Sequence, residues 1–311
     1  MFTTLMVVLP IFALILVGYV SRKIGVLGPN ATTELNRFVV YLALPALLFD
    51  IMAHTTWAEL YQPGFIATYG LSCAIIFAVT VAVRLRAPRH LADASIDGLN
   101  AAYANTGFIG FPLCLLLFGR ASLAPTTIAA IMTVCVLFAV AIVLIEIGLQ
   151  TETHPVHLAR KVGLSLVKNP LLVAPVLGSL LAASGFGVPA SAETFLKLLG
   201  SAASPCALVA LGLFLGQPSG ATRQDTLASL VLVVLKLVFQ PLVAWALAVY
   251  VFGLSPFLTH VTVVLAALPT GTGPFMLAKF YEREAAVTAN AVLISTIGAL
   301  VTISAYLAWV S

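Results

Sequence analysis

The sequence predicts an all-α integral membrane protein with ten transmembrane helices, organised as two inverted repeats of five helices. Three observations support this fold class: the composition, the spacing of long apolar runs, and a recurring pattern of glycine and proline. Hydrophobic residues make up 61% of the chain and charged residues 8%, with a mean hydropathy of +1.11. Soluble domains contain about 25% charged residues, so the expected environment of this chain is lipid.

Ten apolar stretches are bounded by charged residues or by glycine and proline. A membrane span needs about 20 residues, so 311 residues hold ten spans with short connections and form one membrane transport domain, residues 1–311. The first span has no basic segment before it and no small-residue cleavage site after it, so it is expected to be retained. The predicted helices cover residues 2–21, 32–53, 63–83, 94–119, 124–149, 163–184, 190–216, 226–252, 257–280 and 285–310.

Lysine and arginine are distributed unequally between the two faces that these helices define. One face carries only Arg120 and Lys197, and Lys236 lies within a helix. Basic loops stay in the cytoplasm, which predicts a cell-membrane protein, in a bacterial inner membrane, with both termini extracytoplasmic. No basic patch is interleaved with aromatic residues, so nucleic acid is not an expected partner. The other face carries Arg22, Lys23, Arg37, Arg84, Arg86, Arg89, Arg160, Lys161, Lys168, Arg223, Lys279 and Arg283.

Glycine and proline recur between the two halves of the chain. At an offset of 160 residues the matches are Pro10 with Pro170, Gly18 with Gly178, Gly25 with Gly185, Pro29 with Pro189 and Pro45 with Pro205. At an offset of 164 they are Ala102 with Ala266, Thr106 with Thr270, Gly107 with Gly271, Phe111 with Phe275 and Leu113 with Leu277. Residues 1–149 are therefore predicted to repeat as residues 163–311. A repeat of five spans must enter the membrane from opposite sides, an arrangement typical of secondary transporters.

Two predicted helices contain glycine and proline about halfway along. These segments run from Asn105 to Pro112 and from Pro269 to Pro274. A proline removes one backbone donor and displaces the carbonyl four residues earlier, so both helices are predicted to be broken and to cross near the midplane. Broken helices of this kind direct their N-terminal dipoles at an anionic substrate. The alternative is two ordinary proline kinks.

Three further polar residues lie in the middle of predicted spans. Lys236 is about ten residues into its helix, and no acidic residue shares its depth, so a substrate anion is one candidate partner. Alternatively, Lys236 is neutral or bonded to backbone carbonyls. Asn290 and Ser295 face the same cavity or form hydrogen bonds between helices, the commoner use of such residues.

Enzymatic and cofactor-dependent functions find no motif in this sequence. It contains no nucleophile elbow, phosphate loop, paired carboxylate or intramembrane metalloprotease motif. The four cysteines lie inside apolar runs without metal-ligand spacing. We therefore expect a protein that is not an enzyme and that needs no cofactor or metal.

The order and spacing of several motifs resemble the auxin efflux carrier family over nearly the whole chain. The motifs are residues 36–38, 44–49, 105–112, 168–170 and 269–274, with the run 292–302. The likeness is to a bacterial-type member, since only residues 150–162 stand where many plant carriers have a long hydrophilic loop. The resemblance implies carriage of organic anions such as auxin or malonate, and a fold similar to bile acid sodium symporters.

In that fold the first, second, sixth and seventh helices form a scaffold, which suits a homodimer, and the third to fifth and eighth to tenth form a mobile transport unit. The leading hypothesis is thus an elevator-type, alternating-access carrier of a small carboxylate. Sodium coupling lacks a buried carboxylate ligand at the crossing, and proton coupling and uniport both stay open. A passive channel and a ligand sensor are the other classes. The residues expected at the substrate are Asn105, Thr106, Gly107, Pro112, Lys236, Pro269, Thr270, Gly271, Thr272, Pro274, Asn290 and Ser295.

Overall fold

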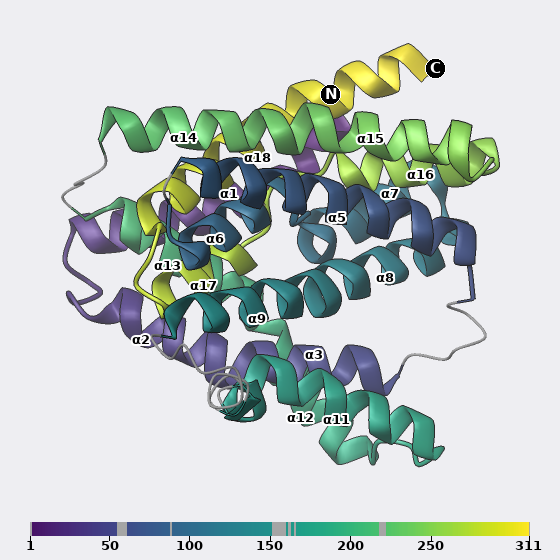
Figure 1. The fold of residues 1–311 in the computed structure, drawn as a ribbon. Coiled ribbons are helices and arrows are strands. Elements are labelled where there is room, and N and C mark those ends of the chain that lie inside the picture. The colour runs from purple at the N-terminus through teal and green to yellow at the C-terminus, as the bar shows by residue number, and fades with distance from the viewer. Residues whose placement is uncertain are drawn as a thin grey trace.

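The computed structural model describes residues 2–54, 61–87, 89–150, 160, 163–164, 166–217 and 222–310. Within these residues the regular structure is helical, apart from one isolated β-bridge (Figure 1). A helical chain with several lipid-compatible spans is an integral membrane protein, since helices satisfy their own backbone groups in lipid. The helices long and apolar enough to cross a membrane are Ala31–Ala53, Pro63–Arg86, Arg120–Leu149, Ala190–Leu215, Arg223–Val251 and Ala285–Trp309.

The helices follow one another with short connections. The first half of the chain forms α1 (Phe2–Lys23), α2 (Ala31–Phe38), α3 (Leu44–Ala53), α5 (Pro63–Arg86), α6 (Leu91–Ala102), α7 (Phe111–Phe118), α8 (Leu123–Ile131) and α9 (Phe138–Leu149). The second half forms α11 (Pro170–Ser184), α12 (Ala190–Ser201), α13 (Ala203–Leu215), α14 (Arg223–Val234), α15 (Gln240–Ala246), α16 (Pro256–Ala266), α17 (Gly273–Phe280) and α18 (Ala285–Val310).

Wider π-helical turns join several of these helices into longer spans. They are η1 (Val39–Ala43), η2 (Thr106–Gly110), η4 (Met132–Leu137), η5 (Leu235–Phe239) and η6 (Leu247–Val251), with a short 3₁₀ turn η3 (Arg120–Ser122). Through η1, for example, α2 continues into α3 as the single span Ala31–Ala53. Such turns widen a helix locally and are frequent at functional sites.

Local capping moves two helix starts away from the predicted boundaries. The helix predicted from residue 226 begins at Arg223, because Thr222 Oγ1 accepts the Asp225 N–H at 3.2 Å and the Asp225 carboxylate accepts the Thr222 N–H at 2.8 Å. The helix predicted over 163–184 is interrupted at Asn169, whose backbone is extended and whose side chain accepts the Leu171 N–H at 3.0 Å. Hydropathy does not register either cap.

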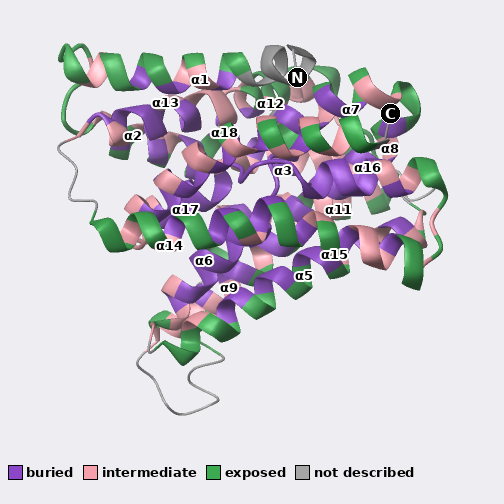
Figure 2. Cartoon of the chain, turned by 90° about the horizontal axis from the view of Figure 1, so that it is seen from above, coloured by how far each residue is buried: buried purple, intermediate pink, exposed green. Residues whose placement is uncertain are grey.

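Two helix pairs approach each other closely through glycine. α1 lies along α13, and α11 lies along α3 (Figures 1 and 2). A Cβ atom at Gly212 of α13 would lie 2.0 Å from the carbonyl oxygen of Ile15, and one at Gly178 of α11 would lie 2.5 Å from that of Phe49. Backbone therefore meets backbone in both pairs, as in small-residue interfaces of membrane helices.

Burial divides the molecule into an interior of α6, α16 and α17 and a periphery whose apolar side chains are exposed (Figure 2). In α16 and α17 the buried residues include Val261, Leu265, Phe275 and Met276. On α5 and α14, by contrast, apolar side chains such as Val79 and Val231 point outward, where lipid replaces water. The interior helices are the two whose spans are interrupted.

Candidate functional site

The first break separates α6 from η2 and α7. Helix α6 ends at Ala102, Tyr103 is extended with φ −84° and ψ 100°, and helical structure resumes at Thr106. Pro112 has no N–H to donate to the carbonyl of Phe108, and Gly107 and Gly110 lower the cost of unwinding nearby. The interruption therefore follows from the local sequence.

The second break separates α16 from α17. Helix α16 ends at Ala266, and α17 begins at Gly273 with Pro274 in its first turn. Proline is favoured at that position because the N–H it lacks would have no partner within the helix. Pro269 lies within the non-helical residues between the two helices.

The two breaks lie antiparallel and hydrogen-bond to each other through their backbones. Ala104 and Thr270 form the isolated antiparallel bridge. The Asn105 N–H donates to the Pro269 carbonyl at 2.9 Å, and the Gly271 N–H donates to the Tyr103 carbonyl at 3.1 Å. Segments more than 160 residues apart thus satisfy backbone groups that their own helices leave open, as buried backbone requires.

Side chains from neighbouring helices fix Thr270 in this crossing. Thr270 Oγ1 donates to the Asn100 carbonyl at 2.7 Å, and the Thr270 N–H donates to Ser295 Oγ of α18 at 3.0 Å. Both residues are fully buried. Ser295 therefore makes the interhelical hydrogen bond that the sequence analysis gave as its alternative role.

A cavity of about 60 Å³ lies against the crossing. Asn105, Thr106, Gly107, Gly271 and Thr272 of the predicted site residues line it, whereas Pro112, Lys236, Pro269, Thr270, Pro274, Asn290 and Ser295 do not. The remaining lining residues are Val39, Leu44, Leu47, Tyr103, Ala104, Val134, Ala203, Ser204, Ala207, Gly273 and Met276. The breaks form one wall, and residues of η1, α3 and α13 form the facing wall.

The electrostatic character of the cavity comes from neutral donors and helix ends. Gly273, the first residue of α17, lies on its wall, as do Thr106 and Gly107 at the start of the helix after the first break. The first N–H groups of a helix carry partial positive charge and have no partner within the helix. Thr106 Oγ1 is buried without a hydrogen-bond partner. This wall can accommodate an anion that accepts hydrogen bonds.

Lys236 lies on the far side of the crossing from the cavity lining. It is fully buried in η5, and its Nζ donates to the carbonyl of Ala266, the last residue of α16, at 2.7 Å. One turn later, Gln240 Nε2 donates to the carbonyl of Ala102, the last residue of α6, at 3.0 Å. One helical face therefore caps the C-terminal ends of both half-helices, which otherwise expose unpaired carbonyls.

Sequence reasoning missed Gln240 and Tyr103. Gln240 is a polar residue deep in an apolar span, four positions after Lys236, and this spacing places both on one face of a helix. Tyr103 directly precedes the broken segment that was singled out. The mid-span polarity of Gln240 was a usable signal, whereas nothing local indicates where the Tyr103 ring points. Asn290, which the sequence placed near the substrate, is half-buried on α18 outside the cavity.

Two ion pairs link the start of α6 and the residues before it to the turn between α17 and α18. Both carboxylate oxygens of Asp93 accept hydrogen bonds from Arg283, at 2.5 and 2.9 Å. Arg89 donates to Glu284 Oε1 at 3.1 Å. Glu284 adopts a left-handed backbone with φ 51°, a conformation that costs free energy in a residue with a Cβ. The turn is therefore held in place by charge against an unfavourable backbone.

Glu284 lies outside the predicted spans, and its burial raises the pKa of its carboxyl to about 7 from 4.5. Between these values the folded protein binds more protons than the unfolded chain, so the free energy of unfolding falls as the pH rises from about 4.5 to about 7. Glu284→Gln is expected to remove this fall, so its melting temperature relative to wild type is higher at about pH 8 than at about pH 5. Thermal denaturation in detergent checks this, with Glu282→Gln as control. Parallel pH profiles of wild type and Glu284→Gln would contradict it.

Comparison with known proteins places the chain among transporters. Residues 3–307 match the family model described as "Membrane transport protein". The "Putative malonate transporter" of Rhizobium meliloti is 28% identical over 301 residues, covering 96% of this chain and 93% of that protein. "Auxin efflux carrier component 8" of Arabidopsis thaliana is 21% identical over 96% of this chain and 94% of its own. An "Uncharacterized transporter" of Methanothermobacter thermautotrophicus is 26% identical over 95% of both. The chain therefore belongs to the membrane transport protein family that includes the auxin efflux carriers.

Proposed function

We propose that the protein is a secondary carrier that moves a small organic anion, a carboxylate, across the cell membrane by alternating access. The observation that carries this proposal is the cavity at the crossing of the two breaks, where helix N-termini and the unpaired hydroxyl of Thr106 meet. These groups are neutral donors with positive partial charge, which suits a group that only accepts hydrogen bonds.

The proposed topology has ten spans in two inverted repeats, residues 1–149 and 163–311, with both termini extracytoplasmic. Gly18 and Gly178, equivalent at an offset of 160, support it: a Cβ atom would lie 2.2 Å from the Val209 carbonyl oxygen in one case and 2.5 Å from the Phe49 carbonyl oxygen in the other. The pairs α1 with α13 and α11 with α3 are related by the same equivalence. A pseudo-two-fold axis relates such contacts.

Two apolar grooves on the outside of the molecule support the same repeat. One, of about 480 Å³, lies between α5 and the helix formed by η4 and α9. The other, of about 390 Å³, lies between α15, α16 and α18. Residues lining the first recur in the second at an offset of 164: Cys73 with Leu237, Ala74 with Val238, Phe77 with Pro241, Ala78 with Leu242 and Val81 with Trp245.

The proposed movement is that of an elevator, in which one group of helices carries the site past another. The scaffold would consist of α1, α2 with α3, α11, and α12 with α13, and the transport unit of the remaining helices. The composition of the cavity supports this division. The two breaks supply one wall, while Val39, Leu44 and Ser204 supply the wall from the proposed scaffold. A substrate bound there would lie at the boundary that slides.

The names of two relatives, a malonate transporter and an auxin efflux carrier, indicate carboxylates as the substrate class for this chain. None of the described residues that line the cavity is acidic. Sodium sites are usually built with carboxylate oxygen ligands, so sodium coupling finds no support at this position.

Malonate is the probe for the first test, because its neutral diamide, malonamide, has nearly the same shape. Malonate is expected to raise the melting temperature of the detergent-purified protein, whereas malonamide leaves it unchanged. Ligand at about 100 times its dissociation constant stabilises the folded state by about 2.7 kcal/mol. Other mono- and dicarboxylates are tested in the same way. No shift with any carboxylate would contradict the proposal, as would uptake into proteoliposomes that neither saturates nor shows counterflow.

Two variants locate the site within this test. Thr106→Val removes an unpaired hydroxyl on the cavity wall and is expected to reduce the shift caused by malonate. Lys236→Ala removes the cap of α16 and leaves a buried carbonyl unpaired, so it is expected to lower the melting temperature without ligand while retaining the shift. Loss of the shift in Lys236→Ala alone would instead assign Lys236 to the anion.

A further inference from the structure

Tyr103 is the first residue after α6, and its side chain projects from the first break. Its backbone is extended, and its carbonyl accepts the Gly271 N–H at 3.1 Å. The bridge at Ala104 and Thr270 follows immediately. Because the crossing holds the backbone on both sides of this residue, it also determines where the ring lies.

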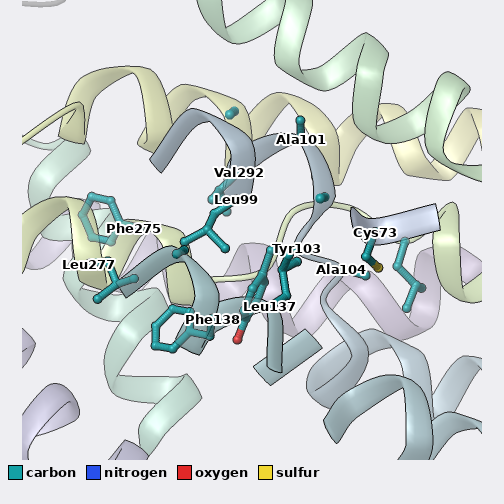
Figure 3. Packing of buried hydrophobic residues seen from close by; sticks show 14 of the residues in the cluster. Cys73, Leu99, Ala101, Tyr103, Ala104, Leu137, Phe138, Phe275, Leu277 and Val292 are labelled. Atoms are coloured by element: carbon teal, nitrogen blue, oxygen red, sulfur yellow. The ribbon is translucent and has the colours of Figure 1, made fainter. Parts of the chain in front are cut away.

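The ring of Tyr103 packs over the glycines of the second break. A Cβ atom at Gly271 would lie 2.8 Å from Tyr103 Cε1, and one at Gly273 would lie 2.7 Å from both Cζ and Oη. Phe138 packs against the same ring, with the centroids 5.6 Å apart and the planes at 54° (Figure 3). Only glycine leaves room for this arrangement. The hydroxyl therefore lies over the first residue of α17, in the wall of the cavity.

The Tyr103 hydroxyl is a buried donor without a protein acceptor. The residue is 6% exposed, and its hydroxyl has no hydrogen-bond partner among the described residues. Buried tyrosine hydroxyls usually have one. Thr106 Oγ1, in the same cavity, is also buried and unpaired. Two unpaired hydroxyls in one small cavity indicate an acceptor that the folded chain itself does not supply.

Building on the proposed function, we infer that Tyr103 Oη donates a hydrogen bond to a carboxylate oxygen of the transported anion and determines specificity for it. A carboxylate has acceptors only, so it can take the phenol donor and face the N-terminal N–H groups of α17 together. A primary amide of the same shape would bring its own NH₂ donor against these donors and lacks the charge that the helix end favours. The site thereby discriminates against the neutral analogue.

Tyr103→Phe tests this inference, because it keeps the ring over Gly271 and Gly273 and removes only the hydroxyl. The dissociation constant for malonate, from thermal-shift titration and calorimetry, is expected to rise roughly ten- to a hundredfold, the factor for a hydrogen bond to a charged group. The melting temperature without ligand should stay unchanged, since the hydroxyl has no protein partner to lose. Tyr250→Phe, at a 74% exposed tyrosine, is the matched control and should bind malonate like wild type.

The possible outcomes separate this inference from the proposed function. Malonate binding that is equal in Tyr103→Phe and wild type overturns the role of the hydroxyl and leaves the carrier proposal standing. A wild-type protein that responds to no carboxylate overturns both. Gly273→Ala is a second, independent variant: its Cβ displaces the hydroxyl while Tyr103 remains, and malonate binding should weaken in the same direction.

Discussion

Replacing Gly212 by leucine is expected to lower the free energy of unfolding by at least about 3 kcal/mol, or to prevent recovery of folded protein. A Cβ at this position would lie 2.0 Å from the carbonyl oxygen of Ile15 and 2.8 Å from the backbone nitrogen of Tyr19. Both are backbone atoms, so no side-chain rotation relieves the contact and α1 must move away from α13. Thermal denaturation of the detergent-purified protein, monitored by size-exclusion chromatography, measures the effect.

Gly187→Leu is the matched control for this substitution. No atom lies within 4 Å of the Cβ position at Gly187, and its φ is not in the left-handed region, so a side chain has space there. Its melting temperature should remain close to that of wild type. If Gly212→Leu were as stable as Gly187→Leu, the close approach of α1 and α13 would be wrong.

Thr270→Val is expected to reduce malonate counterflow in proteoliposomes about tenfold or more. The substitution keeps the shape of the side chain but removes the donor to the Asn100 carbonyl, a bond of 2.7 Å within a fully buried site. A buried carbonyl left unpaired costs about 1–3 kcal/mol, and 1.4 kcal/mol corresponds to a factor of ten. Because Thr270 also forms the bridge to Ala104, this cost falls on the geometry of the crossing.

Thr127→Val is the control for a threonine whose hydroxyl serves only its own helix. Thr127 Oγ1 donates to the Leu123 carbonyl within α8, at an exposed position. It should transport like wild type. Counterflow by Thr270→Val at the wild-type rate would show that the position of this bond does not matter to transport.

The sequence predicted the parts of this molecule that depend on local chemistry. Hydropathy identified an all-α membrane protein, and the order of short motifs identified its family. Glycine and proline near residues 107 and 271 predicted interruptions where α6 and α16 end, because helix breaking depends on residues within one turn.

What the sequence left open depends on contacts between distant segments. Lys236 had two roles in the sequence analysis, and its depth alone does not distinguish a substrate from a carbonyl 30 residues away. The partners of Ser295 and Thr270 and the position of the Tyr103 ring likewise follow from the crossing. Hydropathy also missed the caps at Thr222 and Asn169, since capping depends on single polar atoms.

The caps at Ala266 and Ala102 have a mechanical consequence. They are donated by Lys236 and Gln240, which lie one turn apart on a single helix. Any displacement of that helix relative to either break removes a hydrogen bond from a buried carbonyl, and the backbone bonds between the breaks penalise their separation as well. The three segments therefore form a stiff triangle, so the softest deformations of the molecule should lie along its outer boundary, where the cavity faces η1, α3 and α13.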